Sequence, residues 1–179
     1  PYTQKVVGRS NHFKGIVFKD DDFDTNADAS IEGYLFLPPN KDFDALPKAC
    51  REYIKYGEAQ DFHTGYKCRI RKHWYITPSL WSPDAFVLRQ VGEYPKLIIN
   101  KTGASSTDTI HRIRFKRKVK PELMALSFLN SLTFAFSEIT GRSYGGGVLT
   151  FEPTEIEELP FPILEKSTID FKKVDSLIR

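Results

Sequence analysis

The sequence is poor in the residues that build disulfide or metal scaffolds. Its 179 residues include two cysteines, Cys50 and Cys68, and four histidines. None of them stands at Cys-x-x-Cys or His-x-x-x-His spacing, so we expect neither a disulfide framework nor a zinc site, but reduced thiols in a cytoplasmic protein. No apolar run approaches the length of a membrane span, and the N-terminus lacks a signal-peptide pattern.

Several catalytic motifs are also missing. The phosphate-binding pattern Gly-x-x-x-x-Gly-Lys-Ser/Thr is absent. Gly141-Arg-Ser-Tyr-Gly145 matches Gly-x-Ser-x-Gly in letters, but a predicted helix precedes it and a strand follows, the reverse of a nucleophile elbow. A metal-dependent nuclease stays open as an alternative. Against it, Pro83-Asp84 is followed by Glu93-Tyr-Pro-Lys96, which is one residue too long and carries a strand-breaking proline.

The sequence does contain alternating apolar segments typical of an α+β fold. The composition is 40% hydrophobic and 27% charged, which suits a globular chain that buries a core. Pro121 opens the most apolar segment, which predicts one long buried helix to Thr140, ended by Gly141. We therefore predict a mixed, sheet-rich single domain over residues 1–179. Predicted strands cover 13–18, 31–37, 68–71, 85–89, 97–100, 110–115 and 148–151.

Three shorter segments complete the expected fold. Asp44 is the predicted cap of a helix over 45–56 that stops at Gly57. The acidic segment 20–30 is expected to be a loop. A turn of helix within 152–160 and a short amphipathic helix within 169–178 are expected near the end of the sequence.

Positive charge is concentrated in the middle of the chain. The net charge is +3, but residues 66–118 hold twelve Lys and Arg against three Asp and Glu. Strand alternation would place Lys67, Arg69 and Arg71 on one face, with Lys72 next in the run. The same alternation would group Arg112, Arg114 and Lys116. Two strands with three cations on one face suit a surface that meets DNA phosphates and base edges.

Two loops add candidate contacts. Lys101, with Ser105 and Ser106, lies in a small-residue loop suited to phosphate anchoring. In GRSYGGGVL, Arg142 and Tyr144 stand beside Gly145–Gly147, three residues that are costly to order. These glycines either allow a sharp turn or bring the backbone close to DNA, and the sequence leaves both readings open.

The segments YKCRIRKHWYITP, KLIINKTGASSTDTIHRI and EITGRSYGGGVLTFEPTEIEELPFP resemble the C-terminal part of adenine-specific DNA methyltransferases of restriction–modification systems. The resemblance covers roughly residues 60–163. It implies a prokaryotic target recognition domain that binds double-stranded DNA beside its own catalytic domain. That catalytic domain would lie upstream and use S-adenosylmethionine.

The same family has an Asn/Asp-Pro-Pro-aromatic catalytic motif, where this chain has Leu37-Pro-Pro-Asn40. The triple glycine follows a helix, which is the wrong order for a cofactor loop. We therefore expect no catalytic residues, no cofactor site and no enzymatic activity in this chain, which begins at Pro1 and reads as a C-terminal fragment. A subunit-interaction module of a restriction complex is the second alternative to DNA recognition.

Overall fold

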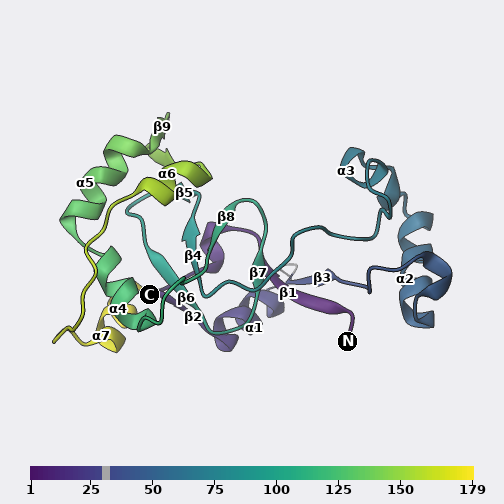
Figure 1. The fold of residues 1–179 in the computed structure, drawn as a ribbon, viewed down its shortest axis with the longest axis horizontal. Coiled ribbons are helices and arrows are strands. Elements are labelled where there is room, and N and C mark those ends of the chain that lie inside the picture. Colours follow the sequence, from purple (N-terminus) through teal and green to yellow (C-terminus); the bar gives the residue numbers. More distant parts are fainter. Residues whose placement is uncertain (30–32) are drawn as a thin grey trace. The chain divides into compact units, whose positions relative to one another are not determined.

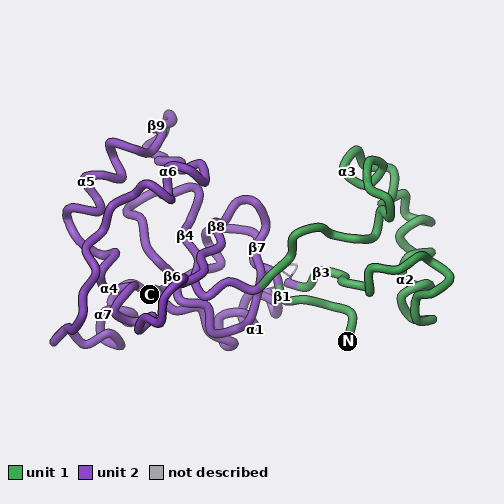
Figure 2. Tube along the Cα trace, viewed as in Figure 1, with its two compact units in different colours: residues 1–5, 34–81 green, residues 6–33, 82–179 purple. Residues whose placement is uncertain are grey.

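The computed structural model describes residues 1–29 and 33–179 (Figure 1). The chain forms two compact units (Figure 2). Unit 1 comprises Pro1–Lys5 and Tyr34–Trp81, and unit 2 comprises Val6–Gly33 and Ser82–Arg179. The mixture of helices and sheets confirms the predicted α+β class. The assignment of residues 1–179 to one recognition domain did not anticipate this division and stays a prediction.

Unit 2 is built on a four-stranded mixed sheet. Its order is β2-β6-β4-β8, with β4 antiparallel to both neighbours and β2 parallel to β6. The strands are β2 (Val17–Phe18), β4 (Ala85–Leu88), β6 (Leu97–Asn100) and β8 (Ile110–Ile113). The predicted strands over 85–89 and 97–100 are confirmed, whereas those over 13–18 and 110–115 are shorter than expected.

This sheet is buried on both faces. Along β4, Phe86 faces one apolar cluster and Val87 faces the other, and along β6 the same division separates Ile98 from Ile99. The four residues of β4 are all buried. A continuous apolar run rather than an alternating one is what a doubly covered strand requires.

Helices and two smaller ladders surround the sheet. The helices of unit 2 are α1 (Asp20–Asp28), α4 (Pro121–Phe128), α5 (Ser131–Thr140), α6 (Pro153–Glu158) and α7 (Phe171–Ile178), with the short turn η1 (Ser10–His12). A second sheet has the antiparallel order β5-β10-β9, formed by β5 (Gln90–Val91), β10 (Val148–Thr150) and β9 (Arg142–Tyr144). β7 (Ser105–Ser106) pairs in parallel with the last two residues of β1 (Thr3–Val7).

The predicted long helix over 121–140 is wrong, because it is broken after Phe128. The side chain of Asn130 accepts a hydrogen bond from Thr133 N at 3.0 Å and donates one to Ser127 O at 2.6 Å. It thereby ends α4 and caps α5, and the two helices meet at 66°. Gly141 ends α5 as predicted.

The two halves of this segment also differ in burial. α4 packs on the sheet, whereas α5 exposes Leu132, Phe136 and Ile139. Among the described residues, no single helix has both the length and the apolar content of a membrane span, although α4 and α5 pass that test together as a bent pair.

The acidic segment 20–30, expected to be a loop, forms α1 as far as Asp28; Ser30 lies outside the described residues. Three aspartates occupy the first turn, where negative charge is favoured by the helix dipole. Asp22 accepts a hydrogen bond from Lys19 N at 3.0 Å, and Phe23 is buried at 2% exposure. The Asp22 cap and the burial of Phe23 therefore stabilise a helix in a segment whose polar composition favours a loop.

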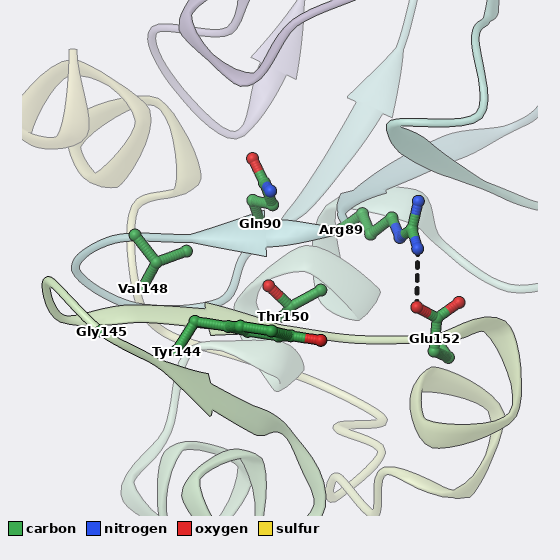
Figure 3. A pocket seen from close by; sticks show the side chains of 7 residues that line it. All are labelled: Arg89, Gln90, Tyr144, Gly145, Val148, Thr150 and Glu152. Atoms are coloured by element: carbon green, nitrogen blue, oxygen red, sulfur yellow. Dashed lines mark hydrogen bonds and ion pairs between the residues drawn. The ribbon is translucent and has the colours of Figure 1, made fainter.

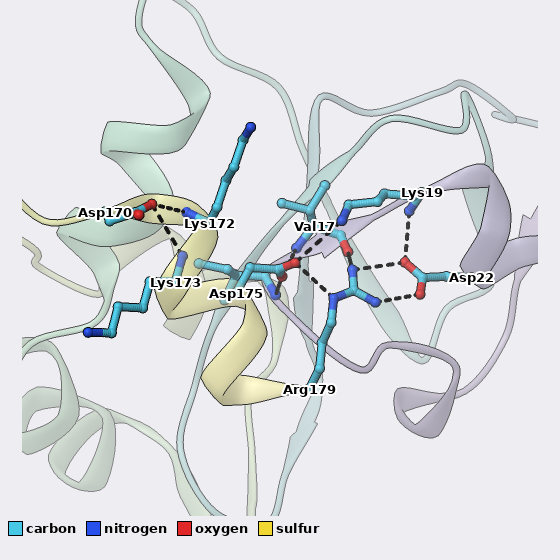
Figure 4. Close-up of polar contacts among 9 residues, drawn as sticks. Val17, Lys19, Asp22, Asp170, Lys172, Lys173, Asp175 and Arg179 are labelled. Atoms are coloured by element: carbon cyan, nitrogen blue, oxygen red, sulfur yellow. Dashed lines mark hydrogen bonds and ion pairs between the residues drawn. The ribbon is translucent and has the colours of Figure 1, made fainter.

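α7, which confirms the predicted C-terminal helix, is attached to β2 by a buried carboxylate (Figure 4). Asp175 Oδ1 accepts hydrogen bonds from Ile16 N at 2.8 Å and Val17 N at 3.1 Å. Its Oδ2 accepts one from Arg179 Nε at 2.8 Å, and Arg179 donates to both oxygens of Asp22, at 2.6 and 3.1 Å. We call Asp22, Asp175 and Arg179 the carboxylate clamp.

The clamp keeps both carboxylates ionised. Burial is the largest influence on the pKa of Asp22 and of Asp175 and acts to raise both. The hydrogen bonds from Arg179 and from backbone N–H groups outweigh it, so each pKa lies below its ordinary value. Hydrogen bonds to the same two carboxylates raise the pKa of Arg179.

Unit 1 has a small core of its own. In it, Thr3–Lys5 of β1 pair antiparallel with β3 (Tyr34–Phe36). Its helices are η2 (Phe43–Ala45), α2 (Lys48–Ala59), η3 (Phe62–Thr64) and α3 (Tyr66–Arg69). Leu46, Cys50, Ile54 and Tyr75 form the buried cluster.

Three expectations for unit 1 need correction. The predicted strand over 31–37 is present at 34–36, and residues 31 and 32 lie outside the described residues. α2 begins after Pro47 rather than at the predicted cap Asp44. Gly57 does not stop the helix. It lies inside α2, where a Cβ atom would approach Trp74 Cη2 to 2.8 Å, so the residue is needed for close packing.

Candidate nucleic-acid interface

The predicted cationic strand at residues 68–71 is wrong, because the segment is helical. Arg69 N and Cys68 N donate to Gly65 O at 3.0 and 2.9 Å, which makes the single turn α3. Tyr66 and Ile70, which strand alternation would place on the face opposite the cations, are 70% and 66% exposed. With no neighbouring strand to accept its backbone hydrogen bonds, the segment satisfies them within itself.

The four cations of this segment therefore do not share a strand face. Lys67 and Arg69 are exposed on α3. Arg71 Nη1 donates to Trp74 O at 3.5 Å, and Lys72 Nζ lies 3.8 Å from Asp42 Oδ1. All four belong to unit 1, whereas every other predicted contact residue belongs to unit 2.

The second predicted cationic face is also incomplete. Arg112 lies in β8, opposite Phe86 of β4, and is half-buried. β8 ends at Ile113, so Arg114 and Lys116 follow in an irregular exposed segment. Alternation no longer orients residues beyond the last paired position, and the three cations are not placed together by one strand.

The two serines that follow β6, predicted as phosphate contacts, are buried in this structure. Ser105 is 0% and Ser106 is 6% exposed, and Ser106 Oγ donates to Ile110 O at 3.0 Å. Asn100 Nδ2 holds the loop by donating to Pro83 O and Ala104 O, both at 2.9 Å. Lys101 is half-exposed, with Nζ 3.8 Å from Glu122 Oε1.

The triple glycine forms the turn of a β-hairpin. A sharp turn was one of the two readings that the sequence left open, but the strand β9 before it was not expected. Tyr144 of β9 pairs with Val148 of β10, so Gly145–Gly147 make a three-residue connection. Gly146 has φ +86° and Gly147 φ +77°, in the left-handed region that side chains disfavour. Two of the three glycines are therefore explained by backbone conformation alone.

Arg142 fixes this hairpin to α6. Its Nε donates to Glu155 Oε1 at 2.7 Å, and Glu155 Oε2 accepts from Glu152 N at 2.7 Å. The bond from Glu152 N, followed by that from Arg142, lowers the pKa of Glu155. Arg142 is thus engaged in an ion pair, although about half of its side chain is exposed.

A polar hollow of about 410 Å³ opens beside the hairpin (Figure 3). Tyr144, 56% exposed, lies along one side of it, and Arg89 lies at the other. Arg89 Nη2 donates to Glu152 Oε1 at 2.6 Å, which raises the pKa of Arg89 and orients its guanidinium. Gly145, Gln90, Val148 and Thr150 complete the lining.

A second hollow of about 350 Å³ shares Gln90 with the first. It is lined by Gly8, Arg9, Ser10, Asn11, Gln90 and Thr109. Arg9, Asn11 and Gln90 are exposed there, and their side chains carry the donors and acceptors that read base edges. We call the two hollows together the polar groove.

Of the residues that line the polar groove, Tyr144 and Gly145 were candidates from the sequence, whereas Arg9, Asn11, Arg89 and Gln90 were missed. One signal was available, because the polar pair Arg89-Gln90 directly follows a fully apolar strand. Arg9 and Asn11 stand far from it in sequence and join it only through the fold.

The comparison with protein families was decisive. The family model for the C-terminal domain of the Type II methyltransferase M.Eco57I matches residues 1–179. The chain belongs to this family. The searches of curated proteins and of solved structures found no match. The match covers both units, and it confirms the resemblance to the C-terminal part of a DNA methyltransferase that the segments between residues 60 and 163 indicated.

Substitutions in the hairpin turn separate a structural role of the glycines from a contact role. Gly146→Ala and Gly147→Ala should each lower the free energy of unfolding by about 1–2 kcal/mol, the cost of a left-handed side-chain residue. Gly145→Ala is the matched control, because no atom lies within 4 Å of a Cβ placed there and its φ is not left-handed. Urea unfolding measures all three. Equal stability of the three variants would contradict the hairpin geometry.

Proposed function

We propose that the chain is the DNA recognition domain of an adenine-specific methyltransferase of a prokaryotic restriction–modification system, a cytoplasmic role. The match to the methyltransferase C-terminal domain family supports this proposal most directly. Adenine specificity comes from the resemblance of GRSYGGGVLTFEP and its neighbours. On this proposal the domain binds double-stranded DNA and positions a separate catalytic domain on it.

The polar groove is the proposed surface for base readout. Arginine can form two hydrogen bonds with one guanine, and asparagine or glutamine can form two with one adenine. Arg9, Asn11 and Gln90 supply these groups on a surface that Tyr144 and the hairpin border. The proposed phosphate contacts are cationic side chains, because Lys and Arg that bind the DNA backbone provide affinity without sequence preference. They are Lys67, Arg69, Arg71, Lys72, Lys101, Arg112 and Arg114.

We propose that methyl transfer and S-adenosylmethionine binding take place in the catalytic domain. The glycine-rich stretch of this chain connects two antiparallel strands. A cofactor loop would instead lead from a strand into a helix N-terminus. The glycine-rich stretch therefore does not fit a cofactor loop, and we assign no catalytic residue to this chain.

The test uses a pool of randomised DNA duplexes. Sequencing of the bound fraction should show enrichment at several positions, and binding to random duplex should weaken with salt at a slope of about −4 to −5 if four to six phosphates are neutralised. Absence of enrichment together with a near-zero slope would contradict DNA recognition and favour a protein partner.

Gln90→Ala should weaken binding to the enriched duplex by about 1–3 kcal/mol while leaving binding to random duplex nearly unchanged, because only a base contact is lost. Gln60→Ala is the matched control, since Gln60 is an exposed glutamine at the end of α2, remote from the groove in sequence and in a different unit. Fluorescence anisotropy measures both. Equal losses on enriched and random duplex would show that Gln90 does not read a base.

A further inference from the structure

Unit 1 carries a row of exposed aromatic rings that the polar groove does not explain. Tyr53, Tyr56 and Phe62 are 53%, 55% and 57% exposed. Phe36 and Tyr53 have ring centroids 4.7 Å apart, Tyr53 and Tyr56 6.0 Å, and Tyr56 and Phe62 6.4 Å. We call these four residues the aromatic row, in which Phe36 is partly buried against the core of unit 1 and the other three are exposed. Its rings are neighbours rather than scattered surface residues, so it is a contiguous apolar patch.

The aromatic row stands on a packed support. Tyr53 and Tyr56 project from α2, the helix that buries Cys50, Ile54 and Gly57. A Cβ atom at Gly57 would lie 2.8 Å from Trp74 and 3.5 Å from Phe62, so η3 is held close to the helix. Rings fixed by such packing lose little conformational freedom when a ligand stacks on them.

The charge of unit 1 complements a polyanion. Its residues include nine Lys and Arg against five Asp and Glu. Lys67 and Arg69 on α3 are exposed, and within unit 1, which is described throughout, neither side chain has an ion-pair partner. α3 packs against η3, the turn that carries Phe62. Proteins that bind single-stranded nucleic acid combine exposed aromatic rings, on which bases stack, with cations that contact the backbone.

We propose that the aromatic row binds unstacked nucleobases of single-stranded DNA. A duplex offers only base edges to a protein, because its base faces are stacked on each other, so flat exposed rings suit bases that have left the stack. The proposal rests on the proposed function in one respect, namely that the ligand is DNA. It adds a second binding mode, in which unit 1 holds a locally opened strand while the polar groove reads duplex.

Binding of a fluorescently labelled 20-nucleotide oligo-dT to the whole chain tests this proposal. Tyr56→Ala and Phe62→Ala should each weaken binding by about fivefold or more, the lower end of the contribution of one stacked base. Tyr56→Phe keeps the ring and should bind like the wild type. Leu177→Ala is a matched surface control in unit 2, since Leu177 is 78% exposed.

Salt dependence separates stacking from charge. Lys67→Ala together with Arg69→Ala should flatten the salt slope for oligo-dT, whereas Tyr56→Ala should lower affinity at every salt concentration and leave the slope unchanged. No binding of oligo-dT, or binding that the ring substitutions do not weaken, overturns the proposal. Self-association of the chain that the same substitutions abolish also overturns it and makes the row a protein interface.

The duplex measurements give an independent result. If the wild-type chain binds oligo-dT through the rings but does not recognise duplex DNA, only the proposed function is rejected. Duplex recognition without ring-dependent oligo-dT binding would reject the aromatic-row proposal alone.

Discussion

Asp175→Ala should lower the free energy of unfolding by about 3 kcal/mol or more. The carboxylate is 5% exposed and is the acceptor for Ile16 N and Val17 N. Its removal leaves two buried N–H groups without an acceptor, each at a cost of about 1–3 kcal/mol. Arg179 keeps Asp22 as its partner, so the loss falls mainly on the junction between α7 and β2. Urea unfolding measures the change.

Asp170→Ala is the matched control within the same helix. Asp170 also accepts hydrogen bonds from two backbone N–H groups, those of Lys172 and Lys173, at 2.9 and 3.3 Å. These groups are exposed, so water replaces the lost acceptor, and the expected cost is about 1 kcal/mol. If Asp170→Ala and Asp175→Ala lower the free energy of unfolding equally, burial of the clamp does not contribute to stability.

The pH dependence provides a second readout of the same substitution. Because the folded pKa of Asp22 and of Asp175 is lowered, their contribution to stability is complete above the ordinary aspartate pKa. It is lost as the pH falls through the lower folded values. Stability of the wild type should therefore decrease over this acidic range, and Asp175→Ala should reduce that decrease. An unchanged pH dependence in the variant would contradict the clamp.

Gly15→Ala should destabilise the fold by about 3 kcal/mol, at the upper end of the cost of overpacking. A Cβ atom at Gly15 would overlap Oδ1 of Asp175 and lie 3.1 Å from Cγ of Arg179. The glycine is thus required by the close approach of the clamp rather than by its own backbone, since its φ is not left-handed. Thermal or urea unfolding detects the loss.

A double-mutant cycle identifies the cause. In the Asp175→Ala background the overlapping carboxylate is gone, so Gly15→Ala should cost much less than it does in the wild type. Gly8→Ala serves as the control, because a Cβ there meets only Thr107, at 3.6 Å, an ordinary contact distance. Additive costs of Gly15→Ala and Asp175→Ala would rule out the steric explanation.

Local signals predicted the elements whose cause is local. Pro121 begins α4, Gly141 ends α5, and the continuous apolar run of Ala85–Leu88 forms a strand covered on both faces. The GRSYGGGVL stretch led to the correct family. The α+β class followed from the same patterns, because apolar spacing reports which residues must leave water.

Tertiary contacts decided the rest. Alternating cations predicted a strand over 68–71, but a strand needs a hydrogen-bonded neighbour, and without one the segment became the helical turn α3. The sequence predicted Ser105 and Ser106 to be accessible hydroxyl groups, but both pair with β1 and are buried.

The candidate site itself depended on residues far apart in the chain. The order of residues in the motifs, the composition and the charge distribution are properties of the sequence alone, and they were enough to predict the fold class and the family resemblance. The polar groove joins Arg9 and Asn11 to Gln90, and the clamp joins Ile16 to Asp175 across 159 positions. Such pairings form because the whole core buries its apolar surface at once, a condition that no short segment carries within itself.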